Sequence, residues 1–316
     1  MIEAQELTKR YGDKVAVDRL TFTVRPGLVT GFLGPNGAGK STTMRLILGL
    51  DRPTSGRVTV DGLPYASHPD PLRVAGALLE ARAVHTSRSA HNHLLALAAT
   101  HGISRARVDE VIDFVGLDQV ARKRAGAFSL GMGQRLGIAA AILADPSNLL
   151  LDEPVNGLDP EGILWIRTTL RELADEGRTV LVSSHLMSEM ALTAEHVIVI
   201  GRGRLMADMP TAELIARSSG QVVVVVSPDA ARLREALSRP GVTVGEAGPD
   251  RFEVRGLSAA EIGGVAAQVG AVLHELTPQQ ASLEEAFMTM TRDEVEYHSH
   301  AIPPETTRGT PDRSAA

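Results

Sequence analysis

The sequence predicts an α/β protein in which a mostly parallel sheet, covered by helices on both faces, precedes a smaller α+β domain. Apolar segments at 28–33, 149–151, 179–182 and 197–200 alternate with helical stretches. This alternation is typical of parallel strands that are buried on both faces. The composition changes after about residue 210, and a length of 316 residues also favours two domains.

The first 210 residues supply the elements of the larger domain. Short strands and turns fill the first 70 residues, and the apolar segment 28–33 ends in a glycine-rich loop. Helical spacing runs from Ser41 to Leu50, and residues 88–145 have mainly helical patterns. We therefore predict a domain over 1–210 with a helical subdomain at about 85–145.

Residues 211–295 predict a small ferredoxin-like accessory domain. Its expected elements, in the order βαββαβ, are a strand at 221–226, a helix at 230–238, strands at 242–246 and 251–255, a helix at 258–269 and a strand at 271–275. A further helix is expected from Ser282, whose spacing to Glu285 suits a capping box. Residues 296–316 are polar and predict a disordered tail.

Charge and composition exclude several classes of protein. A net charge of −6 argues against nucleic-acid binding through a broad basic face. The absence of cysteine excludes disulfide and thiolate chemistry. The N-terminal residues lack a secretory pattern, and no stretch approaches the roughly 20 apolar residues that span a bilayer. Work at a membrane would therefore require a partner.

A phosphate-binding loop follows the apolar segment 28–33. The motif G-x-x-x-x-G-K-S comprises Gly34, Pro35, Asn36, Gly37, Ala38, Gly39, Lys40 and Ser41, with Thr42 as a further candidate contact. Glycines allow successive N–H groups to point at phosphate oxygens, where the helix N-terminus adds positive potential. Lys40 can reach the β- and γ-phosphates, and the Ser41 hydroxyl suits Mg²⁺. The motif predicts a nucleoside triphosphate site.

Two carboxylates end the apolar segment 149–151. Asp152 and Glu153 stand where a strand of a parallel sheet delivers its carboxyl end, the usual ligand edge. Asp152 suits coordination of Mg²⁺. Glu153 could orient or deprotonate an attacking water. With the phosphate loop, these residues predict nucleotide hydrolysis.

The order of further segments resembles the ATPase subunits of ABC transporters over residues 1 to about 210. These segments are Tyr11, the loop 128–132 followed by Gln134 and Arg135, the segment 156–159, and Ser183-Ser184-His185. They resemble, in turn, the aromatic residue that stacks on adenine, the signature loop, the D-loop and the switch histidine. The resemblance implies a P-loop NTPase with a RecA-like core and a helical subdomain, and catalytic roles for Glu153, His185 and Lys40.

The resemblance also implies a dimer that holds two ATP molecules between its subunits. Ser129 and Gly131 would contact the ATP of the opposite chain, and Asp159 would lie beside it. Release after hydrolysis would move a separately encoded transmembrane permease. The chain would then lie on the cytoplasmic side of the cell membrane, peripheral to its inner face, and contact the membrane through that permease. Residues 80–97 are the expected docking face.

Two positions depart from the common family pattern. Leu130 and Met132 replace a glycine and a glutamine of the signature loop, and Glu80 stands where a metal-side glutamine is usual. Both forms resemble exporter ATPases of the bacitracin and daunorubicin resistance type. A carboxylate at Glu80 still offers oxygen to Mg²⁺. The short motif at 282–287 resembles the accessory domain of the same group, so drug or lipid efflux is the expected process.

Two other functions stay open from the sequence. One is a soluble ABC ATPase acting on ribosomes or DNA, although such proteins usually carry two cassettes or a long coiled coil. The other is a nucleotide-sensing regulatory module. His91 and His93, two residues apart on a predicted helix, would point to different sides and are not expected to share a metal. Trp165 is expected to pack inside the ATPase domain.

Overall fold

A six-stranded sheet forms the centre of the computed structural model, which describes residues 1–80, 84–218, 222–279 and 282–291. Its strand order is β5-β6-β7-β3-β8-β9, with β9 antiparallel to β8 and the other neighbours parallel. The strands are β3 (Leu28–Leu33), β5 (Ala75–Leu78), β6 (Asn148–Asp152), β7 (Thr179–Ser183), β8 (His196–Gly201) and β9 (Arg204–Pro210). The predicted parallel sheet is present, and its carboxyl edge carries the phosphate loop and the two carboxylates.

The ATPase part has two hydrophobic cores, one on each face of the central sheet, because successive apolar side chains of its strands point to opposite faces. In β6, Leu149 and Leu151 face one core and Leu150 faces the other. The smaller core is closed by α1 (Lys40–Ile47) and by an antiparallel sheet of β1 (Ile2–Tyr11), β2 (Lys14–Val24) and β4 (Ser55–Val60). Successive side chains of a strand point to opposite faces, so the apolar strands bury both.

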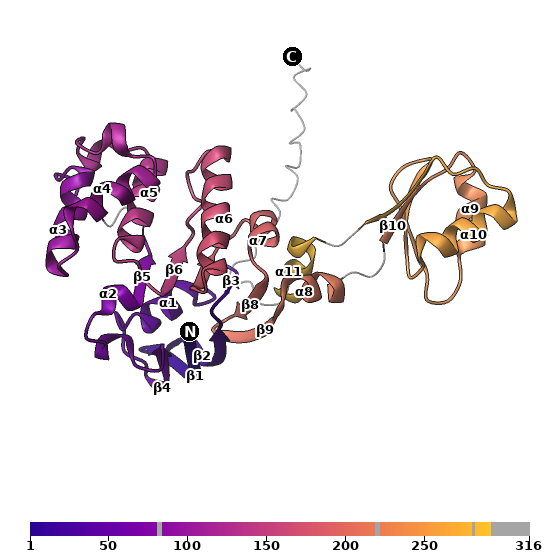
Figure 1. Cartoon of the computed structure of the whole chain (residues 1–316). Helices are drawn as coiled ribbons and strands as arrows, with labels where there is room; N and C mark the ends of the chain where they lie inside the picture. Colours follow the sequence, from indigo (N-terminus) through magenta and orange to yellow (C-terminus); the bar gives the residue numbers. More distant parts are fainter. Residues whose placement is uncertain (81–83, 219–221, 280–281, 292–316) are drawn as a thin grey trace, which may run out of the picture.

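The larger core lies under helices that include the predicted helical region (Figure 1). These helices are α3 (Ala90–Thr100), α4 (Arg105–Phe114), α5 (Leu130–Ile142), α6 (Pro160–Asp175) and α7 (Met187–Thr193). Short helical segments are η1 (Tyr65–Ser67), α2 (Pro71–Val74), η2 (Asp118–Val120) and η3 (Ala125–Ala127). Ser89, Ser104, Ser129 and Asp159 cap α3, α4, α5 and α6 by accepting a backbone N–H three residues on.

The C-terminal lobe has its own sheet and its own core (Figure 1). Its elements are β10 (Val222–Val226), α9 (Ala230–Leu237), β11 (Thr243–Glu246), β12 (Arg251–Arg255), α10 (Ala259–Val269) and β13 (Glu275–Gln279). The antiparallel strand order is β11-β12-β10-β13. This is the βαββαβ succession expected from the sequence, while assignment to the ferredoxin-like family stays a prediction.

The last strand of the lobe differs from its predicted position. The sequence pattern placed it at 271–275, whereas β13 begins at Glu275. Gly270 ends α10 in the left-handed conformation, and Val272 is held by the side chains of Asp229 and Ser227 instead of by a neighbouring strand. The apolar residues after Gly270 therefore form a connection, and the more polar segment that follows forms the edge strand.

Two helices on either side of the lobe pack on the ATPase part. Helix α8 (Thr211–Ser218) and helix α11 (Leu283–Thr291) contact each other, and their buried apolar residues join the larger ATPase core. The lobe proper therefore covers 222–279, within the predicted accessory region of 211–295. The predicted tail, 296–316, lies outside the described residues.

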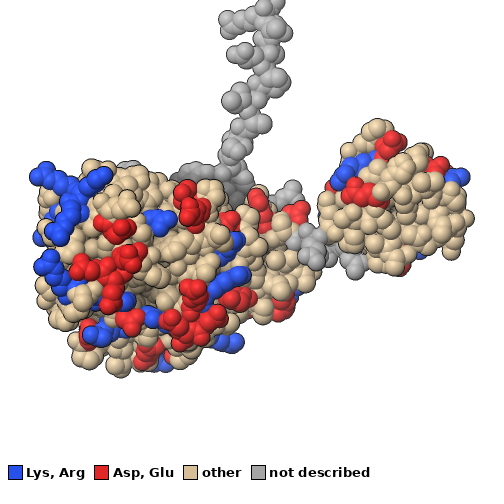
Figure 2. Space-filling model, turned by 45° about the horizontal axis from the view of Figure 1, so that its top comes forward, with Lys and Arg blue, Asp and Glu red and all other residues tan. Residues whose placement is uncertain are grey.

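Charged side chains of both signs are interspersed on the face of the ATPase part drawn in Figure 2. Within the residues that the structure describes, no helix combines the length and the apolar content needed to cross a bilayer.

Candidate functional site

The phosphate loop links the end of β3 to the start of α1. Gly39, at the N-terminus of α1, has a φ of 104°, and a Cβ there would lie 2.4 Å from the carbonyl oxygen of Ala16. A Cβ on Gly34 would lie 2.5 Å from the carbonyl oxygen of Ile200. Both positions require glycine because of their close backbone neighbours. The loop thus presents backbone N–H groups at a helix N-terminus, the arrangement that binds phosphate.

The Lys40 side chain folds back onto the phosphate loop. Its Nζ donates to the carbonyl oxygens of Gly34, at 2.6 Å, and Pro35, at 3.3 Å. Burial lowers the pKa of Lys40 below its ordinary value, and the carboxylates of Glu153 and Asp152 partly offset this effect. The ammonium group therefore stands in a partly desolvated site where an anion would stabilise its charge.

Asp152 connects three elements at the carboxyl edge of the sheet. It accepts a hydrogen bond from Ser41 Oγ at 2.6 Å and a short one from Ser183 Oγ. Ser41 is the second residue of α1, and Ser183 ends β7, directly opposite Asp152 in the parallel register. A hydroxyl and a carboxylate side by side beside a phosphate loop fit Mg²⁺, which takes oxygen ligands and usually keeps several waters. No three His, Cys, Asp or Glu side chains gather among the described residues into an all-protein metal site.

Glu153 is held in an unusual backbone conformation beside His185. Its φ is 52°, in the left-handed region that L-residues seldom adopt. Its N–H donates to Ser183, and its carbonyl oxygen accepts from Gln134 Nε2 at 2.8 Å. The carboxylate lies 2.7 Å from His185 Nδ1 and also accepts from the His185 backbone N–H at 3.3 Å. Fixed contacts of this kind around a strained residue are typical of functional sites.

These residues line a cavity of about 410 Å³. Its walls are formed by Tyr11, Lys14, Ala16, the loop residues 35–42, Asp152 and Glu153. Tyr11, the last residue of β1, is 47% exposed and donates to Asp51 at 3.0 Å. An exposed aromatic side chain at the rim and phosphate ligands at the base suit a nucleotide with its base outward.

The signature loop and the D-loop touch each other outside this cavity. Ser129 caps α5 by accepting from the Met132 N–H, and Asp159 caps α6 by accepting from the Gly162 N–H. A Cβ on Gly131 would lie 2.7 Å from the Gly157 carbonyl oxygen. The Leu130 side chain lies where a Cβ on Gly157 would be. Leu130 therefore contacts the D-loop, and Ser129, Gly131 and Asp159 do not line this chain's own phosphate cavity.

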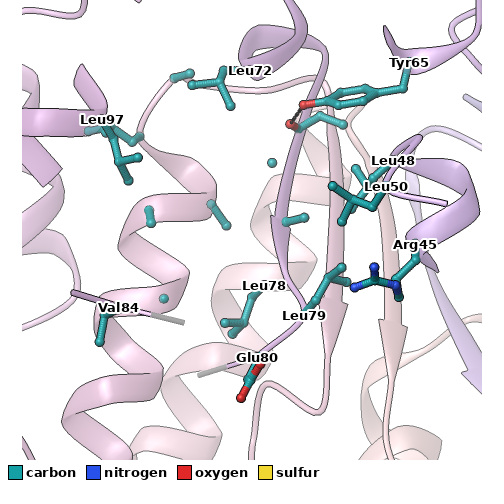
Figure 3. Close-up of a pocket in the computed structure, with 18 of the residues that line it drawn as sticks. Arg45, Leu48, Leu50, Tyr65, Leu72, Leu78, Leu79, Glu80, Val84 and Leu97 are labelled. Atoms are coloured by element: carbon teal, nitrogen blue, oxygen red, sulfur yellow. Dashed lines mark hydrogen bonds between the residues drawn. The ribbon is translucent and has the colours of Figure 1, made fainter. Parts of the chain in front are cut away.

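Glu80 lines a different cavity, a mainly apolar groove of about 460 Å³ between the core and the helical subdomain. It follows β5, which lies beside β6 in the sheet. Figure 3 shows Glu80 at one end of the groove, with Val84 and Leu97 on the wall opposite Leu48. Ser41 and Asp152 line the phosphate cavity and Glu80 lines this groove, so its place beside the metal stays a prediction.

Two residues of the site were not predicted as functional contacts. Gln134 is buried and holds the Glu153 backbone, and Ser183 bonds both Asp152 and the Glu153 N–H. Ser183 could have been found, because a polar residue ends the apolar β7 beside the strand that carries Asp152. Gln134 lies 19 positions before Glu153, and nothing in the local pattern joins the two.

Comparison with protein families gives two matches. Residues 17–156 match the family described as ABC transporter. Residues 221–284, which include the lobe, match a domain of unknown function (DUF8746).

Similar proteins align with more of this chain than the family match at 17–156 does. A bacitracin transport ATP-binding protein of Bacillus licheniformis is 42% identical over 221 residues, which cover 69% of this chain and 72% of that protein. Its counterpart in Enterococcus faecalis is 35% identical over 91% of this chain and 95% of that protein. A Nod factor export ATP-binding protein of Burkholderia pseudomallei is 36% identical over 75% and 80%.

Solved structures agree with the fold. The ATP-binding subunit of an ABC transporter superposes with a TM-score of 0.63 at 26% identity, covering 69% of this chain and 92% of that one. A dimeric bacterial ABC transporter cassette superposes with a TM-score of 0.61 at 23% identity, covering 66% and 98%. The predicted P-loop ATPase fold is confirmed, while the domain boundary at residue 210 stays a prediction.

Proposed function

We propose, from the premise that this chain belongs to the ATP-binding proteins of ABC transporters, that it drives an exporter by hydrolysing ATP between two copies of itself. Membership of the family and ATP hydrolysis follow from the relatives and the fold. The observation that carries the proposal is the convergence of the phosphate loop, Asp152 and Glu153 on one cavity, with His185 on the Glu153 carboxylate.

ATP would be held mainly by this chain's own loop. Tyr11 would stack on adenine at the rim, while the backbone N–H groups of 36–42 would surround the phosphates. Lys40 would exchange its present carbonyl contacts for β- and γ-phosphate oxygens. Ser41 and Asp152 would hold Mg²⁺, which when bound neutralises charge on the phosphates. The metal role of Glu80 stays a prediction.

Hydrolysis would depend on positioning by Glu153 and His185. The Glu153 carboxylate would accept a proton from the attacking water or orient it, and its fixed backbone limits where that oxygen can lie. The His185 imidazole, at hydrogen-bond distance from this carboxylate, would hold the water and contact the γ-phosphate. Placement and electrostatic stabilisation supply most of the acceleration in phosphoryl transfer.

A second copy of the chain would complete the site. Ser129 and Gly131 lie at the N-terminus of α5, where an anion is favoured, but outside this chain's phosphate cavity. A two-fold dimer would bring them to the partner's ATP, with Asp159 and the D-loop at the same interface. The structure of a dimeric cassette among the similar folds supports this arrangement.

The groove beside Glu80 would receive the membrane partner. Its apolar lining includes Val84 and Leu97, within the predicted docking face. A short amphipathic helix of the permease fits a groove of this kind. The chain would then lie against the cytoplasmic face of the membrane through that partner. The relatives named for bacitracin transport and Nod factor export favour an exporter of drugs or lipids over a non-transport ATPase or a nucleotide sensor.

The proposal is tested by measuring steady-state ATP hydrolysis per chain against protein concentration, with wild type beside Glu153→Gln. We expect the wild-type rate per chain to rise with concentration, because each site needs a second copy. The variant should bind ATP, form a stable dimer and hydrolyse at least about a hundredfold more slowly, as expected when a positioned acid–base group is lost. A variant that hydrolyses as fast as wild type would contradict the role of Glu153.

A further inference from the structure

Helix α7 directly follows the switch histidine and is short. Its seven residues begin two positions after His185, whose Nδ1 lies 2.7 Å from the Glu153 carboxylate. Met187, Met190 and Thr193 are buried, so the helix is held by side-chain packing on its neighbours. A helix of two turns has little stability of its own. The orientation of α7, and with it the position of the His185 imidazole, therefore depends on what covers it.

Helix α7 is covered by α11, which lies about 90 residues further along the sequence. Helix α11 contacts both α7 and α8, and its buried residues Leu283, Ala286 and Phe287 belong to the same hydrophobic cluster as Met187 and Met190. Ser282 and Glu285 form reciprocal hydrogen bonds at 2.9 and 3.1 Å that fix the start of α11. Figure 1 shows α11 beside α8 on the ATPase part, apart from the lobe.

The segment that leads out to the lobe is attached to the other end of α7. Thr211, the first residue of α8, donates from Oγ1 to the Ala194 carbonyl oxygen at 2.6 Å. Its N–H donates to the Glu195 carbonyl oxygen at 2.9 Å. The chain thus leaves for the lobe from the C-terminal end of α7 and returns to cover its face.

We infer that Phe287 is a positioning residue for His185, acting through the contact of α11 with α7. Phe287 carries the largest buried side chain of α11 and lies in one cluster with Met187 and Met190. It does not line the ATP cavity. The inference rests on the proposed role of His185. It predicts an effect on the chemical step with nucleotide binding preserved.

The test compares full-length Phe287→Ala with Met288→Ala, the adjacent α11 residue that is 63% exposed. Phe287→Ala should lower kcat about tenfold or more with KM for ATP changed less than about twofold, because a misplacement of about 1 Å can cost about a hundredfold. Phe287→Leu should recover most of kcat, since it refills much of the volume. Met288→Ala should match wild type.

Amide hydrogen exchange on the same proteins provides a readout that is independent of activity. Phe287→Ala should speed exchange at residues 187–193 and leave residues 40–47 of α1 unchanged. Wild-type exchange in α7 together with a wild-type kcat would overturn the inference. So would a parallel loss of kcat, ATP binding and exchange protection in α1, which would indicate general destabilisation. Loss of hydrolysis in Glu153→Gln is scored separately, so failure of the proposed catalytic site is distinguished from failure of this inference.

Discussion

At the scale of single residues, Lys40 combines burial with two neighbouring carboxylates. Burial lowers its pKa from the ordinary 10.5, and Glu153 and Asp152 partly restore it. Triphosphate oxygens against Nζ would favour the ammonium form more strongly and raise the pKa again. ATP binding should therefore take up a proton at pH values between the lowered pKa and that of the complex.

The difference between the pKa of Lys40 without ATP and with ATP predicts how ATP affinity depends on pH. Below the lowered pKa, Lys40 is protonated with and without ATP, so affinity should be constant in that range. As the pH rises through the lowered pKa of the nucleotide-free protein, binding must also protonate Lys40, and the affinity should fall. Calorimetry in two buffers of different ionisation heat measures the proton uptake directly. Lys40→Arg is the control, because arginine stays charged and should remove the pH dependence over the same range. An unchanged alkaline fall in Lys40→Arg would contradict the assignment to Lys40.

At the scale of elements, Trp165 joins the helical subdomain to the core. On α6, its ring is 6.0 Å from that of Phe114 in an edge-on arrangement, and the Arg135 guanidinium lies 4.8 Å above it. Arg135, on α5, also donates to the Val115 carbonyl oxygen at 2.9 Å. Since α5 begins at the signature loop, this contact also sets where Ser129 lies relative to the core.

Arg135→Lys should loosen this joint. Lysine lacks the planar group that stacks on the indole and bonds the carbonyl at once, so we expect a loss of about 1 kcal/mol of unfolding free energy. Urea unfolding followed by fluorescence measures it at the joint itself, because the sequence contains 1 tryptophan. Arg122→Lys, at an exposed position of the same subdomain, should change the midpoint little. Equal midpoints for Arg135→Lys and wild type would show that the stack contributes nothing.

Prediction from the sequence succeeded where a local pattern decides the structure. The phosphate loop, the strand before Asp152 and the capping box at Ser282 each depend on residues a few positions apart. Prediction was less successful where the structure of a segment depends on contacts with residues far away in the sequence. The stripe of Leu283 and Phe287 indicates a buried face, but nothing in that segment names α7 as its partner. Likewise, β13 is placed by its pairing with β10 and not by its own apolar content.

The same distinction holds within the site. Asp152 and Glu153 were predicted because they end an apolar strand beside a phosphate loop. The metal role of Glu80 was predicted from the family resemblance and stays a prediction; in the structure Glu80 follows β5 and lines the apolar groove. Its place in the apolar groove depends on the packing of α5 against β5, which no short motif encodes. The left-handed backbone of Glu153 is likewise held by a hydrogen bond from the distant Gln134.

At the scale of the whole molecule, the lobe and the ATPase part have separate hydrophobic cores. The lobe core contains Phe252, which is 0% exposed and lies under the Arg234 guanidinium. Trp165 packs against the larger ATPase core, which α11 also joins. Two unfolding transitions should therefore be seen by calorimetry, and tryptophan fluorescence should follow the ATPase transition. ATP, which binds the folded ATPase part, should raise that transition and leave the lobe transition in place.

Phe252→Ala separates the two transitions further. A buried phenylalanine replaced by alanine costs about 3–5 kcal/mol, and each kcal/mol lowers the midpoint of a domain this small by about 4–8 °C. The calorimetric lobe transition should move down or vanish while the Trp165 transition and its response to ATP persist. Val272→Ala, at an exposed position of the lobe, is the matched control and should move neither. If Phe252→Ala lowered both transitions equally, the two parts would unfold as one cooperative unit. The attachments of α8 and α11 to α7 would then stabilise the lobe as strongly as its own core does.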